Sequence, residues 1–203
     1  MAVLDPGPGH GAKLNLKLKT ESSKLTLVDS AQSIFQKSNR RIAALALMVF
    51  ALDQFTKWLV LKTLPAYHER IIIDGFFKFV HWGNTGAAWS LFSGNNVTLA
   101  VVALLALVAL FLTRHHFDSH TLPGQIAFGL FFGGIAGNLT DRLLPGRHEV
   151  VDFLRFYLQQ RGGDEIGFPA FNVADTAICT GVALIFLITW KNEHATKPVT
   201  SEK

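Results

Sequence analysis

The chain has 203 residues, of which 49% are hydrophobic, and its mean hydropathy is +0.29. This composition is too apolar for an ordinary soluble domain and indicates a membrane protein. The formal net charge is +4, but the basic residues form no stripe interleaved with aromatic side chains, so no nucleic-acid partner is expected. They gather mainly before the first apolar segment, where anionic phospholipids are the better partner.

Residues 1–40 form a polar, basic N-terminal tail. It contains no apolar stretch resembling a signal-peptide core, so we expect the first hydrophobic span to be retained as a membrane helix. Lys13 to Lys19 alternates like a strand, and Thr26 to Gln36 could form an amphipathic helix on the membrane surface. Disorder is favoured over both.

A helix needs roughly 20 mainly apolar residues to cross the hydrocarbon. The chain has four such runs, at about residues 42–61, 97–113, 125–144 and 171–190. We therefore predict an all-α membrane domain over residues 41–190, followed by a C-terminal tail at 191–203.

The orientation of the spans is predicted from the basic residues, because positive charge is retained on the cytoplasmic side. The N-terminal tail carries seven of them: Lys13, Lys17, Lys19, Lys24, Lys37, Arg40 and Arg41. An even number of spans then places both termini in the cytoplasm and two long connections, 62–96 and 145–170, on the outer face. Within the first connection, Arg70 to Trp82 is rich in Ile, Phe and Val, which favours short strands.

Carboxylates inside the spans are the main functional signal, because an ionisable group in hydrocarbon costs at least about 2.5 kcal/mol on insertion scales. Asp53 lies in the first span, Asp141 near the end of the third and Asp175 near the start of the fourth. Asp152 follows in the outer connection between apolar neighbours. The predicted orientation brings all four aspartates to the outer half of the membrane.

Helical spacing groups the polar residues, because positions three or four apart share a face. Asn138 lies on one stripe with Asp141, and Asn172 lies on another with Asp175. Asp53 precedes Lys57 by four residues, which favours an ion pair. Arg142 should point away from Asp141, toward a lipid phosphate. The spacing of Gly133, Gly134 and Gly137 suits close helix packing. Cys179 follows Asp175 one helical turn deeper in the membrane.

Two neighbouring carboxylates tend to share one proton, which suits the general acid and base chemistry of an aspartic peptidase. Spacing alone does not decide whether Asp141 or Asp152 partners Asp175. Buried Asp and Asn could also merely hold helices together. A transporter or proton channel is the alternative function, but it would need carboxylates through the whole membrane depth, and a purely structural subunit is a third possibility.

No metal or cofactor is expected. The chain has one cysteine, Cys179, and no CxxC or HExxH pattern. His115, His116 and His120 come closest to a cluster, but they fall in a short polar connection and are better explained as a solvated loop.

Five blocks in order resemble the lipoprotein signal peptidase family. They are Asp53 to Lys57 (DQFTK), Asn84 to Ser90 (NTGAAWS), Gly133 to Arg142 (GGIAGNLTDR), Val150 to Phe153 (VVDF) and Phe171 to Asp175 (FNVAD). The resemblance spans most of residues 42–190.

This resemblance implies an aspartic endopeptidase that removes the signal peptide from diacylglyceryl-modified prolipoproteins, before the lipidated cysteine of the lipobox. It implies that Asp152 and Asp175 are catalytic. The residues that match the family's substrate-binding or dyad-supporting positions are Asp53, Lys57, Asn84, Gly86, Asn138, Asp141, Arg142 and Asn172.

The family fold implies a four-helix membrane bundle with a small extracytoplasmic β-cradle and a short surface helix. We expect a monomer in the bacterial cytoplasmic membrane, in contact with phospholipids and with its active site toward the outer face. The long tail and a polar insertion at Gln159 to Gly167 depart from the family pattern.

Overall fold

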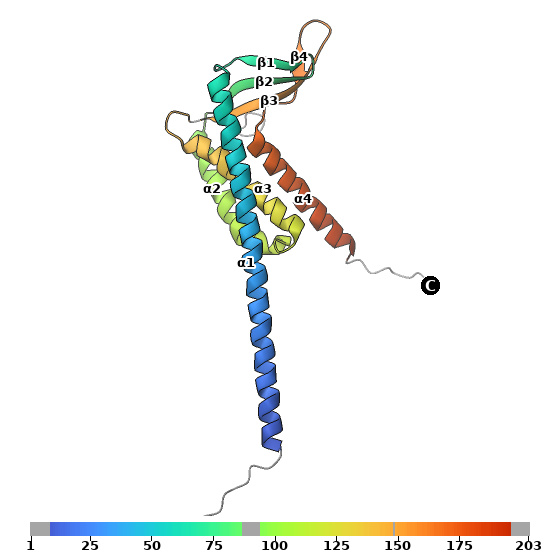
Figure 1. Ribbon diagram of the computed structural model, residues 1–203. Coiled ribbons are helices and arrows are strands. Elements are labelled where there is room, and N and C mark those ends of the chain that lie inside the picture. Colours follow the sequence, from blue (N-terminus) through green and yellow to red (C-terminus); the bar gives the residue numbers. More distant parts are fainter. Residues whose placement is uncertain (1–8, 87–93, 148, 196–203) are drawn as a thin grey trace, which may run out of the picture.

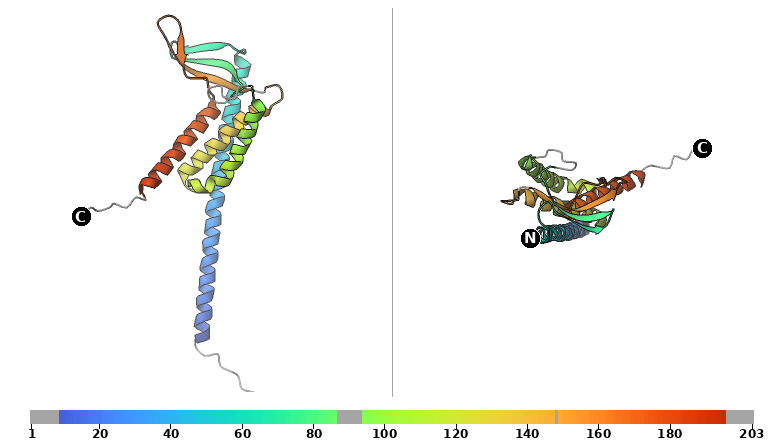
Figure 2. Two further views of the ribbon diagram at one scale, coloured as in Figure 1. Left: turned by 180° about the vertical axis from the view of Figure 1, so that it is seen from behind. Right: turned by 90° about the horizontal axis from the view of Figure 1, so that it is seen from above.

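The computed structural model describes residues 9–86, 94–147 and 149–195. Four long helices carry a small sheet at one end of the molecule (Figure 1). The helices are α1 (Gly9–Thr63), α2 (Asn96–Thr113), α3 (Leu122–Leu143) and α4 (Val173–Ala195), with a 3₁₀ turn, η2 (Arg114–Phe117), after α2. The start of α1 and the end of α4 both lie away from the sheet, as the view from behind also shows (Figure 2).

Four helical stretches are long and apolar enough to cross a membrane: Gln36–Thr63, Asn96–Phe117, Leu122–Leu143 and Val173–His194. They coincide with the four runs that the sequence predicts. Local signals explain several of their ends. Pro65 follows the end of α1, and Thr121 caps α3 by accepting a hydrogen bond from the Gly124 N–H.

The N-terminal tail differs from the prediction of disorder. Helix α1 begins at Gly9 and continues without a break into the first span. From residue 12 to residue 64 the chain has neither glycine nor proline, the two residues that most disfavour a helix interior. A helix already formed in the membrane therefore extends through the polar tail, since propagation is easier than nucleation.

Helix α3 is the centre of the bundle and packs against α1, α2 and α4. Its glycines permit the close contacts that their spacing predicts. An added Cβ at Gly133 would lie 2.6 Å from the Ala46 carbonyl oxygen of α1, and one at Gly134 would lie 2.6 Å from the Ala174 carbonyl oxygen of α4. The opposite surfaces of α1, α2 and α4 expose large apolar side chains, as lipid-facing helices do.

The sheet has four antiparallel strands in the order β1 (Glu69–Ile73), β2 (Phe77–Asn84), β3 (Val150–Gln159) and β4 (Glu165–Gly167). Strands β1 and β2 confirm the prediction for Arg70 to Trp82. Strand β3 was not predicted, although its Val, Phe, Leu and Tyr residues suit a strand. Its formation depends on β2, with Trp82 opposite Asp152 in the register.

The predicted polar insertion, Gln159 to Gly167, forms the turn and second strand of a β3–β4 hairpin. A buried lysine fastens it to the sheet: Lys78 Nζ lies 2.8 Å from Glu69 Oε2 and 2.8 Å from Glu165 Oε1. Burial opposes the charge of Lys78, but its hydrogen bonds to Glu165 and Glu69 raise its pKa overall. Lys78 therefore links β1, β2 and β4.

The short surface helix implied by the resemblance is not present in the described part of the chain near the sheet. The short helix that the described residues do contain, η2, follows α2 at the end of the bundle opposite the sheet (Figure 1). Residues 87–93 lie outside the described residues, and so does the Ala87 to Ser90 part of the second sequence block.

Candidate active site

Asp152 and Asp175 lie where the sheet meets the bundle. Asp152 belongs to β3 and is only 4% exposed, whereas Asp175 occupies the first turn of α4 and is half-buried. Between them the chain passes through the β3–β4 hairpin and returns to β3, where Phe171 pairs with Leu154. This return brings two aspartates 23 positions apart in sequence to the same place.

Asn172 fixes the start of α4 and touches both aspartates. Its Oδ1 accepts a hydrogen bond from the Asp175 N–H (2.9 Å), and its own N–H donates to Asp175 Oδ2 (3.1 Å). This reciprocal pair is a capping box, which satisfies two free N–H groups at the helix start. The Asn172 side-chain amide then donates to Asp152 Oδ1 (2.8 Å).

The second oxygen of Asp152 accepts a hydrogen bond from the last residue of β2. Asn84 Nδ2 donates to Asp152 Oδ2 (2.9 Å), while Asn84 Oδ1 accepts from the Gly86 N–H (2.8 Å). Arg142 donates to the Gly86 carbonyl oxygen (2.6 Å) and to Asn96 Oδ1 (3.0 Å). The prediction that Arg142 reaches toward a lipid phosphate was therefore wrong, because its guanidinium donates hydrogen bonds to these acceptors inside the protein.

Both carboxylate oxygens of Asp175 also accept hydrogen bonds. Its Oδ1 accepts from Asn138 Nδ2 of α3 (2.8 Å), in addition to the Asn172 N–H on Oδ2. Each of the four carboxylate oxygens of Asp152 and Asp175 thus has one N–H donor. In the described part of the chain, neither carboxylate forms a salt bridge.

Asp53 and Asp141 have different partners. Lys57 Nζ lies 2.8 Å from Asp53 Oδ2 and 2.7 Å from Asp141 Oδ2, and all three side chains are fully buried. Arg147 adds a second cation, 2.6 Å from Asp141 Oδ1. The predicted Asp53–Lys57 ion pair is present, and the network of two acids and two bases is electrically neutral.

This neutral network is tied to both neighbouring helices. Asp53 Oδ1 accepts from the Ala174 N–H at the start of α4 (3.0 Å). Gln54 Nε2 donates to Asp53 Oδ2 and to the Gly137 carbonyl oxygen, both at 3.1 Å. A side chain at Gly137 would overlap the Asp53 carboxylate, so glycine is needed for this approach.

The pKa of the Asp152 carboxyl lies well above its ordinary value. Burial first, and then the charge of Asp175, raise its pKa to about 7. The hydrogen bonds from Asn84 and Asn172 and the charge of Lys57 act in the opposite direction. A carboxyl with this pKa can hold or release a proton near neutral pH, which is what acid–base catalysis requires.

The structure thus brings together every predicted site residue and separates them into two groups. Asp152 and Asp175 are held by asparagine amides, and the supporting residues lie behind them. The sequence had not singled out Gln54, Asn96 or Arg147. Gln54 lies inside the first sequence block, which was a usable signal, but Asn96 and Arg147 had none.

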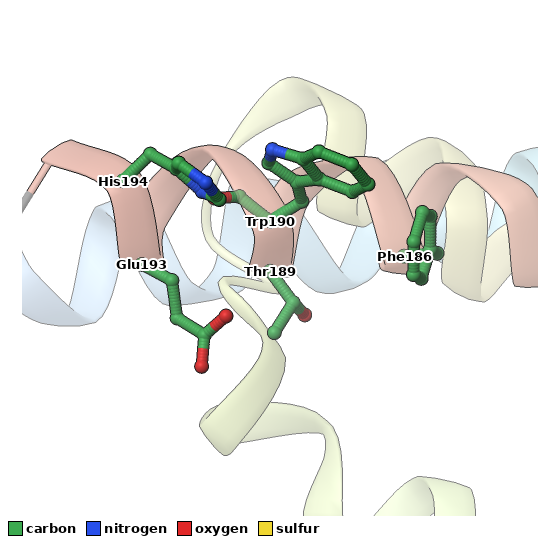
Figure 3. Close-up of a pocket in the computed structure, with 5 residues that line it drawn as sticks. All are labelled: Phe186, Thr189, Trp190, Glu193 and His194. Carbon is green, nitrogen blue, oxygen red and sulfur yellow. The ribbon is translucent and has the colours of Figure 1, made fainter.

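No metal site is found among the described residues, and the pocket on α4 lies outside the candidate active site. No group of three His, Cys, Asp or Glu side chains there could hold a metal ion. A shallow pocket lies on the far half of α4, lined by Phe186, Thr189, Trp190, Glu193 and His194 (Figure 3). It is at the opposite end of α4 from Asp175, so it is not part of this site.

Comparisons with known proteins agree with this arrangement. The family model "Signal peptidase (SPase) II" matches residues 45–191. A lipoprotein signal peptidase of Symbiobacterium thermophilum is 41% identical over 144 residues, covering 70% of this chain and 90% of the relative. That of Bacillus subtilis is 34% identical, covering 70% and 88%.

Solved structures agree as well. One bacterial membrane enzyme matches with a TM-score of 0.67 and 31% identity, over 79% of this chain and 94% of its own. A second matches with a TM-score of 0.61 and 33% identity, over 74% and 92%.

Proposed function

This chain belongs to the signal peptidase II family, and from that premise we propose that Asp152 and Asp175 are its catalytic pair. The protein removes signal peptides from prolipoproteins as an aspartic-type signal peptidase. One observation carries the assignment of the pair. These two carboxylates have only neutral N–H donors, whereas Asp53 and Asp141 are neutralised by Lys57 and Arg147.

The chemistry needs one proton on the pair at the start. The ionised aspartate takes a proton from water as the water oxygen bonds to the scissile carbonyl carbon, and the protonated aspartate donates its proton to the carbonyl oxygen. When the C–N bond breaks, the first aspartate gives its proton to the leaving nitrogen. The second recovers a proton as the new carboxyl group forms, so the pair returns to its starting state.

The remaining residues hold this pair in place. Asn84, Asn138 and Asn172 orient the carboxylates by donating hydrogen bonds to their oxygens. Asp53, Lys57 and Asp141 brace α1 against α3 behind them. Gly86 donates to the side chain of Asn84 at the end of β2, and Arg142 holds Gly86 in place. Such support is needed because small misplacements of catalytic groups cost much of the rate.

We further propose that both termini are cytoplasmic and that the sheet and catalytic pair face outward. The basic residues of the N-terminal tail support this orientation. Asp175 lies at the start of span α4 and Asp152 in strand β3 of the adjoining sheet, where a lipid-anchored substrate can reach the pair from within the bilayer. We expect a monomer that cuts before the diacylglyceryl-modified cysteine.

The test is cleavage of a lipobox peptide by purified protein in detergent or lipid, with lipidated and unlipidated substrates compared. The wild type should cut the lipidated substrate before its cysteine. Asp152→Asn and Asp175→Asn should each lower kcat on the order of 10³-fold, the range expected for loss of a catalytic acid or base. Their circular dichroism and melting should remain close to wild type.

Asp164→Asn is the matched control, because Asp164 lies in the β3–β4 turn and not in the site. It should cleave like wild type. Normal cleavage by either Asp152→Asn or Asp175→Asn would remove that residue from the catalytic pair. Equal cleavage of the unlipidated peptide would contradict the lipidated substrate.

A further inference from the structure

Lys57 has no contact with the catalytic carboxylates, yet it has a third partner that leads to them. Besides Asp53 and Asp141, its ammonium donates to Asn138 Oδ1 at 2.8 Å. All three acceptor oxygens lie within 2.8 Å of the ammonium nitrogen. The side chain is fully buried. Lys57 therefore lacks the access that contact with substrate would need.

The contact with Asn138 decides which way that amide points. A lysine ammonium can only donate, so the oxygen of the Asn138 amide must face Lys57. The NH₂ group then faces the other way, where Asn138 Nδ2 donates to Asp175 Oδ1 at 2.8 Å. A reversed amide would place NH₂ against the ammonium and oxygen against the carboxylate, which makes two repulsive contacts.

The other two asparagines of the site are oriented differently. The oxygen of Asn84 accepts from the backbone N–H of Gly86, and that of Asn172 accepts from the backbone N–H of Asp175. Asn138 alone among the three depends on side chains from other segments. Asn172 Nδ2 also reaches Asn138 Oδ1, but at 3.2 Å and while donating to Asp152 at 2.8 Å. Lys57 supplies the shorter, charged contact.

We propose that Lys57 is a positioning residue that orients Asn138 and thereby makes Asp175 the member of the pair that accepts the proton of water. This inference rests on the proposed catalytic pair. Asp175 accepts the Asn138 amide and lies in the first turn of α4, where the helix dipole favours negative charge. Asp152 belongs to β3 and not to a helix, and it carries the proton that goes to the carbonyl oxygen.

The test separates this role from simple bracing of the helices. Lys57→Met alone would leave Asp53 buried without its cation, so the working variant is Asp53→Asn with Lys57→Met. It removes one charge of each sign and leaves Asp141 paired with Arg147. The reference is Asp53→Asn alone. Arg147→Met is the matched control, because Arg147 shares Asp141 with Lys57 but does not contact Asn138.

The double variant should melt near its Asp53→Asn reference and keep its KM, while kcat falls about tenfold to a hundredfold, the range for losing one hydrogen bond to a charged group. Asn138→Ala should lower kcat by a similar factor. The decisive measurement combines all three substitutions. If Lys57 acts through Asn138, the triple variant should be no slower than the double variant of Asp53→Asn and Asn138→Ala.

Multiplied losses in the triple variant, or a double variant with the kcat of its reference, would overturn the proposal. So would an equal loss of kcat in Arg147→Met, because that would make network charge the cause. Failure of this inference is distinct from failure of the catalytic pair. In the first case Asp175→Asn is still inactive, and in the second it cleaves normally.

Discussion

Two neighbouring pairs of aspartates in this protein have different kinds of partner: cations for one pair and neutral N–H donors for the other. Asp53 and Asp141 are buried against Lys57 and Arg147, so their charges are neutralised within the protein. Asp152 and Asp175 receive only N–H donors from asparagine side chains and one backbone group. The two pairs are joined by Asn138, which contacts Lys57 on one side and Asp175 on the other.

The difference explains why one pair can hold a helix bundle together and the other can move protons. A carboxylate paired with a buried cation is held by that ion pair, which joins the two helices that carry the charges. Two carboxylates without a cation cannot both ionise easily, so one proton is shared and can be transferred. Position in the sequence does not separate these roles, but the partners of each carboxylate do.

The largest expected effect that distinguishes the pairs is on stability. Asp141→Asn should lower the free energy of unfolding by about 3 kcal/mol, because it leaves the buried Lys57 and the partly buried Arg147 with one acid fewer. Asp175→Asn should change it by less than about 1 kcal/mol, since an asparagine can still accept the Asn172 N–H. Thermal or denaturant unfolding in detergent measures both. Equal losses would show that the two pairs do not differ in this way.

The next effect is on the pH dependence of cleavage. Burial and the charge of Asp175 raise the pKa of Asp152 to about 7, so Asp152 keeps its proton up to neutral pH and loses it above. We expect kcat/KM to fall about tenfold per pH unit well above pH 7. Asn84→Ala removes a donor that favours the ionised form, which raises the pKa of Asp152 further.

The alkaline limb of the pH profile should therefore move to higher pH in Asn84→Ala. Glu149→Gln is a suitable control, because Glu149 is not among the main groups that shift the pKa of Asp152. An alkaline limb that does not move in Asn84→Ala would argue against Asp152 as the group that carries the proton.

The smallest effect concerns the ion pair in the sheet. Glu165 is paired with Lys78, and the hydrogen bond from Lys78 lowers its pKa. The pair therefore contributes above the ordinary pKa of Glu165 and is lost in acid. Because Glu165 is partly exposed and Lys78 keeps Glu69, Glu165→Gln should cost less than about 1 kcal/mol.

Cleavage by Glu165→Gln should be unchanged. Glu165 pairs with Gln159, seven positions along β3 from Asp152 and thus roughly 20 Å away. A clear loss of kcat in this variant would mean that the hairpin affects the catalytic pair directly.

The sequence alone determined the parts of this protein that depend on local composition. Apolar runs of sufficient length define the four spans, and the i, i+4 spacing of Asp53 and Lys57 gives their ion pair. Asn172 and Asp175 form a capping box within four residues, so the start of α4 is also locally encoded. The absence of glycine and proline from residue 12 to residue 64 also lets α1 extend through the tail.

Tertiary structure decided which aspartate partners Asp175. Asp141 and Asp152 both had suitable neighbours in sequence, and only the resemblance to the family favoured Asp152. In the fold, Asp141 is taken by Lys57 and Arg147, while β3 pairs with β2 and brings Asp152 to Asn84 and Asn172. These partners come from segments up to 84 positions away from Asp141 along the chain. Hydrogen bonds and ion pairs of that range depend on the packing of whole elements, which local sequence patterns do not contain.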